Sequence, residues 1–579
     1  MKRKSFWAGV AVLAAGLIFV TGGGAATMTT VTLTVNSAAD STTPCTIANH
    51  KSTGTCTLRG AILAANALQQ DNTLFVLKLA AKTYHLSLGT LGVDAATANT
   101  GNIVQIVGKS KTTGKGKHKK TFPASIIDGS GNAKPASVFE IDSPTQMSNV
   151  VITGGSGNPN VTCYNANAGC GGGVYLTSAL DLQNSVVRNN TACSAYTGNG
   201  CTGTYVYGGG IYMPDDSTAE LLTLYKTTVT HNVAYGGGGV YNADRPSTVY
   251  VSWSHIDANT ACSDFSNGVC IDYGFGGGLT NYGEQVTFDH STVNGNAAGA
   301  TAYDTGDGGG IYQDNDNMQL FHTTVSGNVA GYEGGGLYDG ENVDFVYSTV
   351  SHNSAGEYGG GMYLDYLASF KNSTFSSNTA GGAFACTIGV SKTTCTHTIK
   401  TTTGTCLTLY PSATHCTDSN GFGGGIYSDY EYPEFISSTV TKNLAVSIKG
   451  DATNCGGGQG GGVWSSWTLS ALSGTKFTMN TADCGGGIYN NNDGSGPYTF
   501  NLSSSTISGN TALEDGGGIW TSGSGTGTLY GMTITGNKAG RQTGGVWDDQ
   551  LGSVLLGVGN KITKNTSKGS CKNVTFPCK

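Results

Sequence analysis

The chain has 579 residues, a formal net charge of −7, 91 glycines and only 12% charged residues. Proteins average about 7% glycine and about 25% charged residues, so this composition excludes a long coiled coil or helical array, and the lack of glycine at every third position excludes collagen. A hydrophobic share of 38% argues against general disorder, and the acidic balance argues against a nucleic-acid partner.

Residues 1–26 predict a secretion signal. Lys2, Arg3 and Lys4 precede an apolar run at residues 6–20, and Ala25 and Ala26 provide a small-residue cleavage site. That run is too short to span about 30 Å of hydrocarbon, so we expect no membrane span after cleavage. The predicted location is extracellular, with non-covalent retention at the cell surface as the alternative.

Sixteen cysteines in an exported chain predict disulfides. They fall into close neighbours, although sequence alone does not fix their connectivity. The absence of a tight Cys-x-x-Cys pair or a Cys–His cluster makes a zinc site the weaker interpretation. The predicted pairs are Cys45–Cys56, Cys163–Cys170, Cys193–Cys201, Cys262–Cys270, Cys386–Cys395, Cys406–Cys416, Cys455–Cys484 and Cys571–Cys578.

Residues 27–90 predict an N-terminal cap. Leu58, Ile62, Ala65 and Leu68 share one face of a short helix, which could cover an open sheet edge. The stretch around it resembles the CSLREA motif of exported bacterial β-helix proteins. The matching residues are Cys56, Leu58, Arg59, Ala61, Ile62, Ala65 and Asn66, whereas Thr57 and Gly60 replace the motif's Ser and Glu.

Residues 91–147 predict the first coils of a β-helix together with a lysine-rich loop. Six lysines lie between Lys109 and Lys120 among small residues. They could bind an anionic polymer, but a solvated loop is the interpretation we favour.

A repeat dominates residues 148–567. The string Gly-Gly-Gly-aliphatic-Tyr/Trp occurs ten times, and it alternates with Ser/Thr-x-aliphatic-x-x-Asn-x-Ala. Short β-branched segments separated by glycine and asparagine indicate strands and turns, and no unit contains a helical stretch. We therefore predict an all-β fold, a single-stranded right-handed parallel β-helix of about 15 coils, closed at residues 568–579 by a disulfide.

The repeat also assigns structural roles. The aliphatic residues Ile211, Ile311, Leu337 and Met362 should point inward and stack, and the recurring asparagine should form a hydrogen-bonded ladder. The glycine triplets fit tight bends with positive φ. Insertions fall only between Asn-x-Ala and Gly-Gly-Gly, so one edge should carry all the long loops. The repeats resemble those of polymorphic outer-membrane proteins and pectin-lyase-like β-helices, a resemblance that implies an exported β-helix but no single activity.

The residue after each inward aliphatic should point outward, which predicts an aromatic stripe. Its central members are Tyr312, Tyr338 and Tyr363, with Asp314, Asp339 and Glu341 alongside. An exposed stripe could stack on sugar rings, whereas a self-stacking ladder would merely stiffen the rod. Asp314, Asp316, Asp339 and Glu341 are weak Ca²⁺ candidates, and no other cofactor is expected.

Catalytic signatures are missing from the sequence. Arginines are scarce outside the signal, and none lies in a lyase-like pattern. The sequence therefore favours a non-catalytic protein, a monomer that binds polysaccharide or a cell-surface ligand in the manner of an adhesin. A polysaccharide lyase or glycoside hydrolase on the same scaffold is the first alternative, and a structural coat or matrix rod is the second.

Overall fold

The computed structural model describes residues 28–68, 72–94, 101–163, 168–192, 195–197, 200–202, 206–216, 218–243, 245–262, 265–266, 269–270, 273–299, 306–314, 317–381, 386–388, 413–416, 420–429, 432–445, 455, 457–492, 499–523, 526–548, 554–566 and 571–572. The predicted signal lies outside these residues. No helix in this part of the chain combines the length and apolar character that crossing a bilayer requires.

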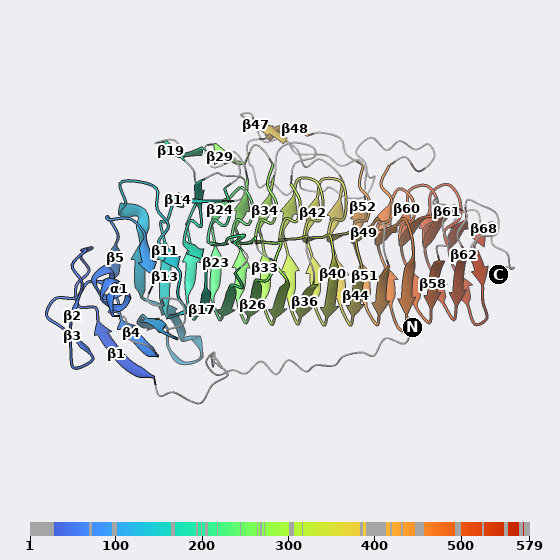
Figure 1. Cartoon of the computed structure of the whole chain (residues 1–579). Coiled ribbons are helices and arrows are strands. Elements are labelled where there is room, and N and C mark those ends of the chain that lie inside the picture. Colours follow the sequence, from blue (N-terminus) through green and yellow to red (C-terminus); the bar gives the residue numbers. More distant parts are fainter. Residues whose placement is uncertain are drawn as a thin grey trace.

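Four long sheets run side by side along an elongated solenoid (Figure 1). In each repeat the chain passes through the third, first, second and fourth sheets in turn, and strands of successive repeats pair in parallel. The first sheet comprises β1 (Thr29–Thr34), β2 (Thr46–Ala48), β3 (Lys51–Thr53), β4 (Thr73–Lys78), β7 (Ile103–Val107), β12 (Thr145–Ser148), β17 (Ala179–Gln183), β22 (Leu221–Tyr225), β26 (Thr248–Ser252), β32 (Gln285–Asp289), β36 (Asn317–Phe321), β40 (Asn342–Val346), β44 (Ala368–Lys371), β50 (Pro433–Ile436), β54 (Leu469–Leu472), β58 (Thr499–Ser503), β62 (Thr526–Tyr530) and β66 (Val554–Leu556).

Most strands in the other three sheets are shorter, with two to four residues each. The second comprises β5 (Thr83–His85), β10 (Ser125–Asp128), β13 (Val150–Thr153), β18 (Val186–Arg188), β23 (Thr228–Thr230), β27 (His255–Asp257), β33 (Thr292–Asn294), β37 (Thr324–Ser326), β41 (Thr349–Ser351), β45 (Thr374–Ser376), β51 (Thr439–Thr441), β55 (Lys476–Thr478), β59 (Thr506–Ser508), β63 (Thr533–Thr535) and β67 (Lys561–Thr563). The third comprises β6 (Leu91–Val93), β11 (Phe139–Ile141), β16 (Val174–Leu176), β21 (Ile211–Met213), β25 (Val240–Asn242), β31 (Leu279–Asn281), β35 (Ile311–Gln313), β39 (Leu337–Asp339), β43 (Met362–Leu364), β49 (Ile426–Ser428), β53 (Val463–Ser465), β57 (Ile488–Asn492), β61 (Ile519–Gly523), β65 (Val546–Asp548) and β68 (Cys571–Lys572). The fourth comprises β24 (Val233–Ala234), β28 (Thr260–Ala261), β34 (Ala297–Ala298), β38 (Val329–Ala330), β42 (Ser354–Ala355), β46 (Thr379–Ala380), β52 (Leu444–Ala445), β56 (Thr481–Ala482), β60 (Thr511–Ala512) and β64 (Lys538–Ala539).

The core consists of aliphatic and phenylalanine side chains that stack from coil to coil. Ile311, Leu337 and Met362 lie in register on neighbouring strands and are fully buried. Because inward and outward positions alternate along each strand, the same positions supply the core in every coil. The predicted parallel solenoid and its inward aliphatic column are confirmed.

The recurring asparagines form a continuous hydrogen-bonded ladder, as predicted. In each step the side-chain amide donates to Oδ1 of the next asparagine, as from Asn353 to Asn378 at 3.0 Å, and also to a backbone carbonyl, here that of Val325. The ladder runs through Asn190, Asn232, Asn259, Asn296, Asn328, Asn353, Asn378, Asn443, Asn480, Asn510, Asn537 and Asn565. It satisfies buried polar groups that would otherwise destabilise the wall.

The glycine triplets make the bend that leads into the third sheet. The first glycine of a triplet has positive φ, as at Gly334 (60°) and Gly359 (62°), a conformation that side chains disfavour. A Cβ on the middle residue, Gly335, would lie 2.4 Å from a carbonyl of the next coil. Both the conformation and the spacing therefore require glycine.

The predicted capping helix forms α1 (Leu58–Ala67) and buries Leu58, Ile62 and Ala65 against the first coils. Thr57 caps its N-terminus by accepting a hydrogen bond from the backbone of Gly60. Arg59 holds Asp40 through two hydrogen bonds, from Nε at 2.7 Å and from Nη2 at 3.1 Å.

The described parts of the insertions lie along one edge (Figure 1), as expected. They form antiparallel hairpins of β19 (Ala195–Thr197) with β20 (Gly200–Thr202), β29 (Phe265–Ser266) with β30 (Val269–Cys270), and β47 (Cys386–Ile388) with β48 (Ala413–Cys416). A further hairpin pairs β14 (Asn158–Thr162) with β15 (Ala168–Cys170). The lysine-rich segment, predicted as a solvated loop, is exposed and forms a β-hairpin of β8 (Ser110–Thr113) and β9 (Lys120–Pro123).

Three predicted disulfides are confirmed: Cys45–Cys56, Cys163–Cys170 and Cys455–Cys484. Cys262 is also disulfide-bonded. In the hairpin of β47 and β48, Cys386 lies in register opposite Cys416. Cys193, Cys395, Cys406 and Cys578 lie outside the described residues, so their predicted pairings stay predictions.

Candidate binding surfaces

The aromatic column of the third sheet is a self-stacked ladder. Tyr338 stacks on Tyr312 with ring centroids 4.7 Å apart and on Tyr363 at 5.0 Å, with interplanar angles of 6° and 3°. The stacking continues through Tyr427 and Trp464 at 4.3 Å. Where Thr280 interrupts the column, Tyr282 lies between Tyr241 and Tyr312 and restores the ring contacts. Such stacking favours a structural role.

The expectation that this stripe faces solvent is wrong for Tyr363, whose exposed fraction is 9%, and Tyr312 and Tyr338 are half-buried. Side chains from the preceding turn cover the column, as Tyr358 does over Tyr427, with centroids 4.7 Å apart. A sugar stacks on the face of a ring, and within the ladder those faces are occupied by neighbouring rings. The column therefore offers few free faces to a glycan.

Asp339, the central candidate for sugar or Ca²⁺ binding, lies inside the solenoid with no solvent exposure. It continues an inner polar column in which Asn242 donates to Asn281 and Asn281 donates to Gln313. The next residue in register is Leu364, which has no polar side-chain atom, and neither carboxylate oxygen of Asp339 meets hydrogen-bond geometry with another described residue. Burial holds the pKa of Asp339 well above its ordinary value, and the acids Glu341 and Asp365 add to the shift.

The other acidic candidates remain at the surface of the third sheet. Asp314 is half-buried, and burial together with the charges of Glu341 and Asp365 raises its pKa. Nearby Glu333 has its pKa raised to about 8, by burial first and then by Asp307 and Asp365. Burial and mutual repulsion therefore favour the protonated, uncharged forms of these acids beside the tyrosine ladder. Asp316 lies outside the described residues.

Within the described residues, only Cys455, Cys484 and Glu514 bring three metal-ligating side chains within 4.8 Å of one another. The two cysteines form a disulfide, so they offer no thiolates to a metal. Glu514 instead accepts a hydrogen bond from the backbone of Cys455 at 3.0 Å. The disulfide and this hydrogen bond link Cys455 to the next two coils.

A second aromatic stack, at the corner between the first and second sheets, is exposed. Trp253, His290, His322 and Tyr347 lie on four successive coils with centroids 4.4, 4.7 and 5.2 Å apart. Each occupies a turn position with positive φ, which aligns the four side chains. His290 donates to Asp289 at 2.8 Å. The two inner rings, His290 and His322, have both faces covered by their neighbours in the stack.

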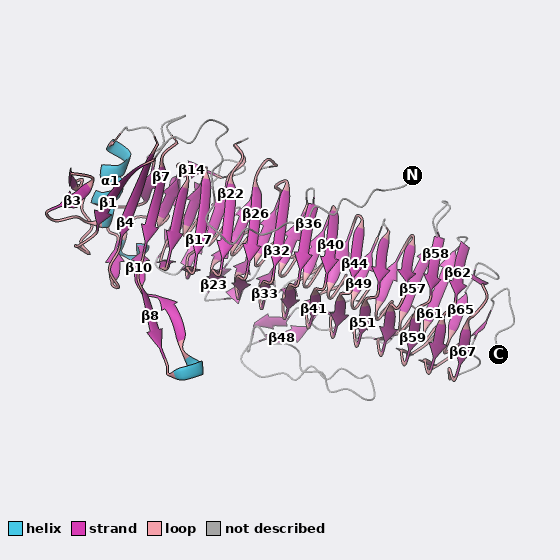
Figure 2. Ribbon diagram, turned by 90° about the horizontal axis from the view of Figure 1, so that it is seen from below, coloured by secondary structure: helices cyan, strands magenta, loops and turns pink. Residues whose placement is uncertain are grey.

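The surface that sequence reasoning missed is the outer face of the first sheet (Figure 2). The middle outward residue of each strand lies in register with the next, so these residues form one row, here called the outer row. Polar side chains dominate it: Gln105, Gln146, Asp181, Thr223, Tyr250, Thr287, Gln319, Asp344, Ser369, Glu434, Ser470, Asn501 and Thr528.

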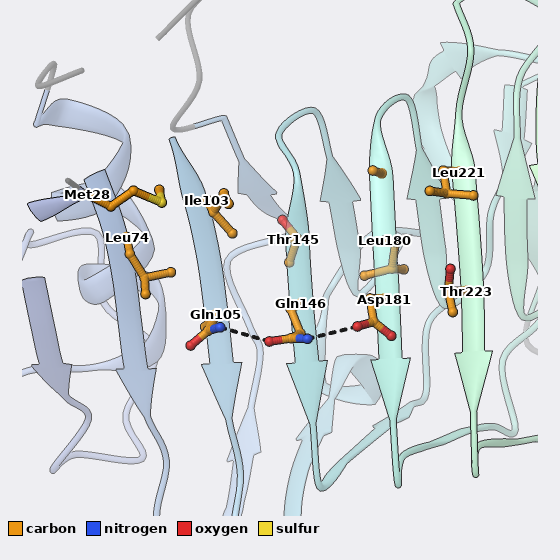
Figure 3. A pocket seen from close by; sticks show the side chains of 11 residues that line it. Met28, Leu74, Ile103, Gln105, Thr145, Gln146, Leu180, Asp181, Leu221 and Thr223 are labelled. Atoms are coloured by element: carbon orange, nitrogen blue, oxygen red, sulfur yellow. Dashed lines mark hydrogen bonds between the residues drawn. The ribbon is translucent and has the colours of Figure 1, made fainter. Parts of the chain in front are cut away.

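Two hollows lie on this face. The smaller, about 130 Å³, spans β4 to β22 (Figure 3), where Gln105 donates to Gln146 at 2.8 Å and Gln146 donates to Asp181 at 2.8 Å. Asp181 is almost fully buried, and its second oxygen has no partner among the described residues. The larger hollow, about 480 Å³, runs over β36 to β54 and contains Gln319, Asp344, Ser369 and Glu434. We call it the central groove.

Tyr432 adds an aromatic side chain to the central groove and is 46% exposed. A sequence signal for the outer row exists, because most of its members lie between two inward apolar residues, as Asp344 lies between Val343 and Phe345. Comparison with protein-family models, curated proteins and solved structures finds no match to this chain.

Proposed function

We propose that this chain is an exported, non-catalytic right-handed β-helix of about 15 coils that binds polysaccharide along the central groove. The cap's resemblance to CSLREA-motif proteins and the disulfides support export. The groove itself supports the ligand class, because carboxylate, amide and hydroxyl groups at strand spacing can hydrogen-bond successive sugar hydroxyls. This placement replaces the tyrosine stripe, whose ring faces are covered.

The observation that carries the proposal is Tyr432, which lines the same open groove as Asp344 and Glu434. An exposed ring can stack on a sugar while the carboxylates accept hydrogen bonds from hydroxyl groups. The described residues that line the groove include carboxylates and no basic side chain, which favours a neutral or amine-bearing glycan over an acidic one.

A glycan-binding panel followed by calorimetry tests the proposal. Tyr432→Ala should weaken binding of the selected glycan about tenfold, equivalent to about 1.4 kcal/mol. Tyr530→Ala is the matched control, because Tyr530 is similarly exposed at the end of β62 but lies outside the groove. Binding that is unchanged in Tyr432→Ala, or equally reduced in Tyr530→Ala, would contradict the proposed groove.

One observation favours a glycoside hydrolase as the second candidate. Asp344, Ser369 and Glu434 lie in register on consecutive strands, so the two acids are two strand spacings apart, about 9.6 Å between backbones. Inverting glycosidases place their carboxyl groups about 6.5–9.5 Å apart. Release of sugar products that is abolished in both Asp344→Asn and Glu434→Gln would establish the enzyme and refute the non-catalytic proposal.

A further inference from the structure

The lysine-rich hairpin is an ordered projection. At its base, the Lys109 amide donates to Oγ of buried Ser125 at 2.8 Å, and the Ala124 amide donates to the Lys109 carbonyl at 2.7 Å. β8 and β9 then pair over four residues each, and a short 3₁₀ turn (Gly116–His118) closes the tip. Figure 2 shows the hairpin standing clear of the sheets.

The two faces of the hairpin differ. Lys111 pairs with Phe122 and Thr113 pairs with Lys120, so these four side chains share one face. Phe122 is 50% exposed there. The opposite face carries Thr112 and Thr121, whose hydroxyl groups are 3.1 Å apart. One face therefore combines lysines with an exposed aromatic ring, and further lysines lie around the tip at Lys115, Lys117 and Lys119.

Charge is divided unevenly along the chain. Residues 27–147 contain 11 lysines and arginines against 6 acids, whereas residues 148–579 contain 16 against 31. Residues 246–370 contain 15 acids and neither lysine nor arginine. Around the hairpin the sign is reversed, since residues 95–127 contain no acid. An anionic surface would thus attract the hairpin and repel the rest of the solenoid.

We propose that the hairpin attaches the protein peripherally to a bilayer containing anionic phospholipid. The lysines would pair with headgroup phosphates while Phe122 enters the interface, and the acidic coils would stay away from the membrane. Phe122 distinguishes a bilayer from a polyanion such as polyphosphate, because polyphosphate has no apolar surface to pack against the ring. The attachment is independent of the central groove.

Vesicle co-sedimentation of the full chain tests this attachment. The protein should bind phosphatidylcholine vesicles only when they contain phosphatidylglycerol, and high salt should release it. Replacing Lys111, Lys115, Lys117, Lys119 and Lys120 with Gln should reduce partitioning at least tenfold. The matched control replaces five exposed lysines on the coils, Lys371, Lys442, Lys476, Lys538 and Lys561, and should leave binding unchanged or stronger.

Two further measurements separate the lipid from phosphate alone. Phe122→Ser should weaken vesicle binding several-fold but leave binding of inorganic polyphosphate unchanged. Binding to polyphosphate without binding to vesicles would overturn the membrane proposal, as would equal losses in the hairpin and control variants. Circular dichroism of each variant confirms that the solenoid is intact, because the replaced side chains are exposed.

Discussion

Tyr338 lies parallel to Tyr363, with ring centroids 5.0 Å apart and planes within 3° of each other. Tyr312 covers the other face of Tyr338 in the same way at 4.7 Å. Tyr338 is therefore a packed element of the wall between two coils, even though its strand position points away from the core.

Tyr338→Ala should lower the free energy of unfolding by about 2–3 kcal/mol, because it removes a half-buried ring and both of its stacking contacts. Urea denaturation measures the change. Tyr530→Ala, at an exposed position, should cost less than about 0.5 kcal/mol. Equal effects at the two positions would show that the ladder does not stabilise the fold.

Asn353→Ala should lower the free energy of unfolding by about 3 kcal/mol, since it removes the bonds to Asn378 and Val325 and leaves the amide of Asn328 without its acceptor. Thermal or chemical denaturation provides the comparison with Asn501→Ala on the exposed outer row. A loss no larger than that of the control would refute the ladder's energetic role.

Glu333 should make the protein less stable in alkali. Its pKa in the folded state is about 8, against an ordinary value of 4.5, so folding favours the protonated form. This contribution is fully present below pH 4.5 and is lost as the pH rises through 8, by at most about 5 kcal/mol. Glu333→Gln should flatten the stability profile between these values, whereas exposed Glu284→Gln should leave it unchanged.

Asp40 should make the protein less stable at acid pH. Burial opposes its charge, but hydrogen bonds from Arg59 and from the amides of Ser87 and Leu88 outweigh that effect and hold the pKa of Asp40 below 3.8. Stability from this group is present above that value and is lost as the pH falls. Asp40→Asn should cost about 1–3 kcal/mol at neutral pH and remove part of the acid sensitivity, unlike exposed Asp94→Asn.

Non-reducing peptide mapping should find Cys386 linked to Cys416. The two residues are opposite each other in an antiparallel pair, where backbones approach within disulfide reach. Recovery of Cys386–Cys395 would instead restore the nearest-neighbour pairing that the sequence suggests.

Features that repeat in every coil were predictable because each coil makes the same contacts as its neighbours. Ile311, Leu337 and Met362 share one environment, as do the ladder asparagines, so spacing alone identified both columns. Alternation also placed the tyrosines outside the core. It carried no information about what covers them, because Tyr358 comes from the variable turn before each glycine triplet.

The central groove was not predictable for a related reason. Ser369 and Glu434 are neighbours in the sheet, although 64 residues separate them in the sequence. The insertion between their coils hides that relationship until the register is known. The prediction of Asp339 as a surface ligand was wrong because its spacing matched that of the surface acids. Asp339 in fact occupies an inward position of β39.

Because the middle coils share one register, the length of the solenoid can change by whole coils. Asn328, Asn353 and Asn378 are each 25 residues apart, and each coil bonds only to the coils before and after it. Duplicating or excising one such unit would rejoin the asparagine, inward aliphatic and tyrosine columns with their own kind. Evolution or engineering can therefore change the reach of this protein in steps of one coil, about 4.8 Å, without redesigning its interior.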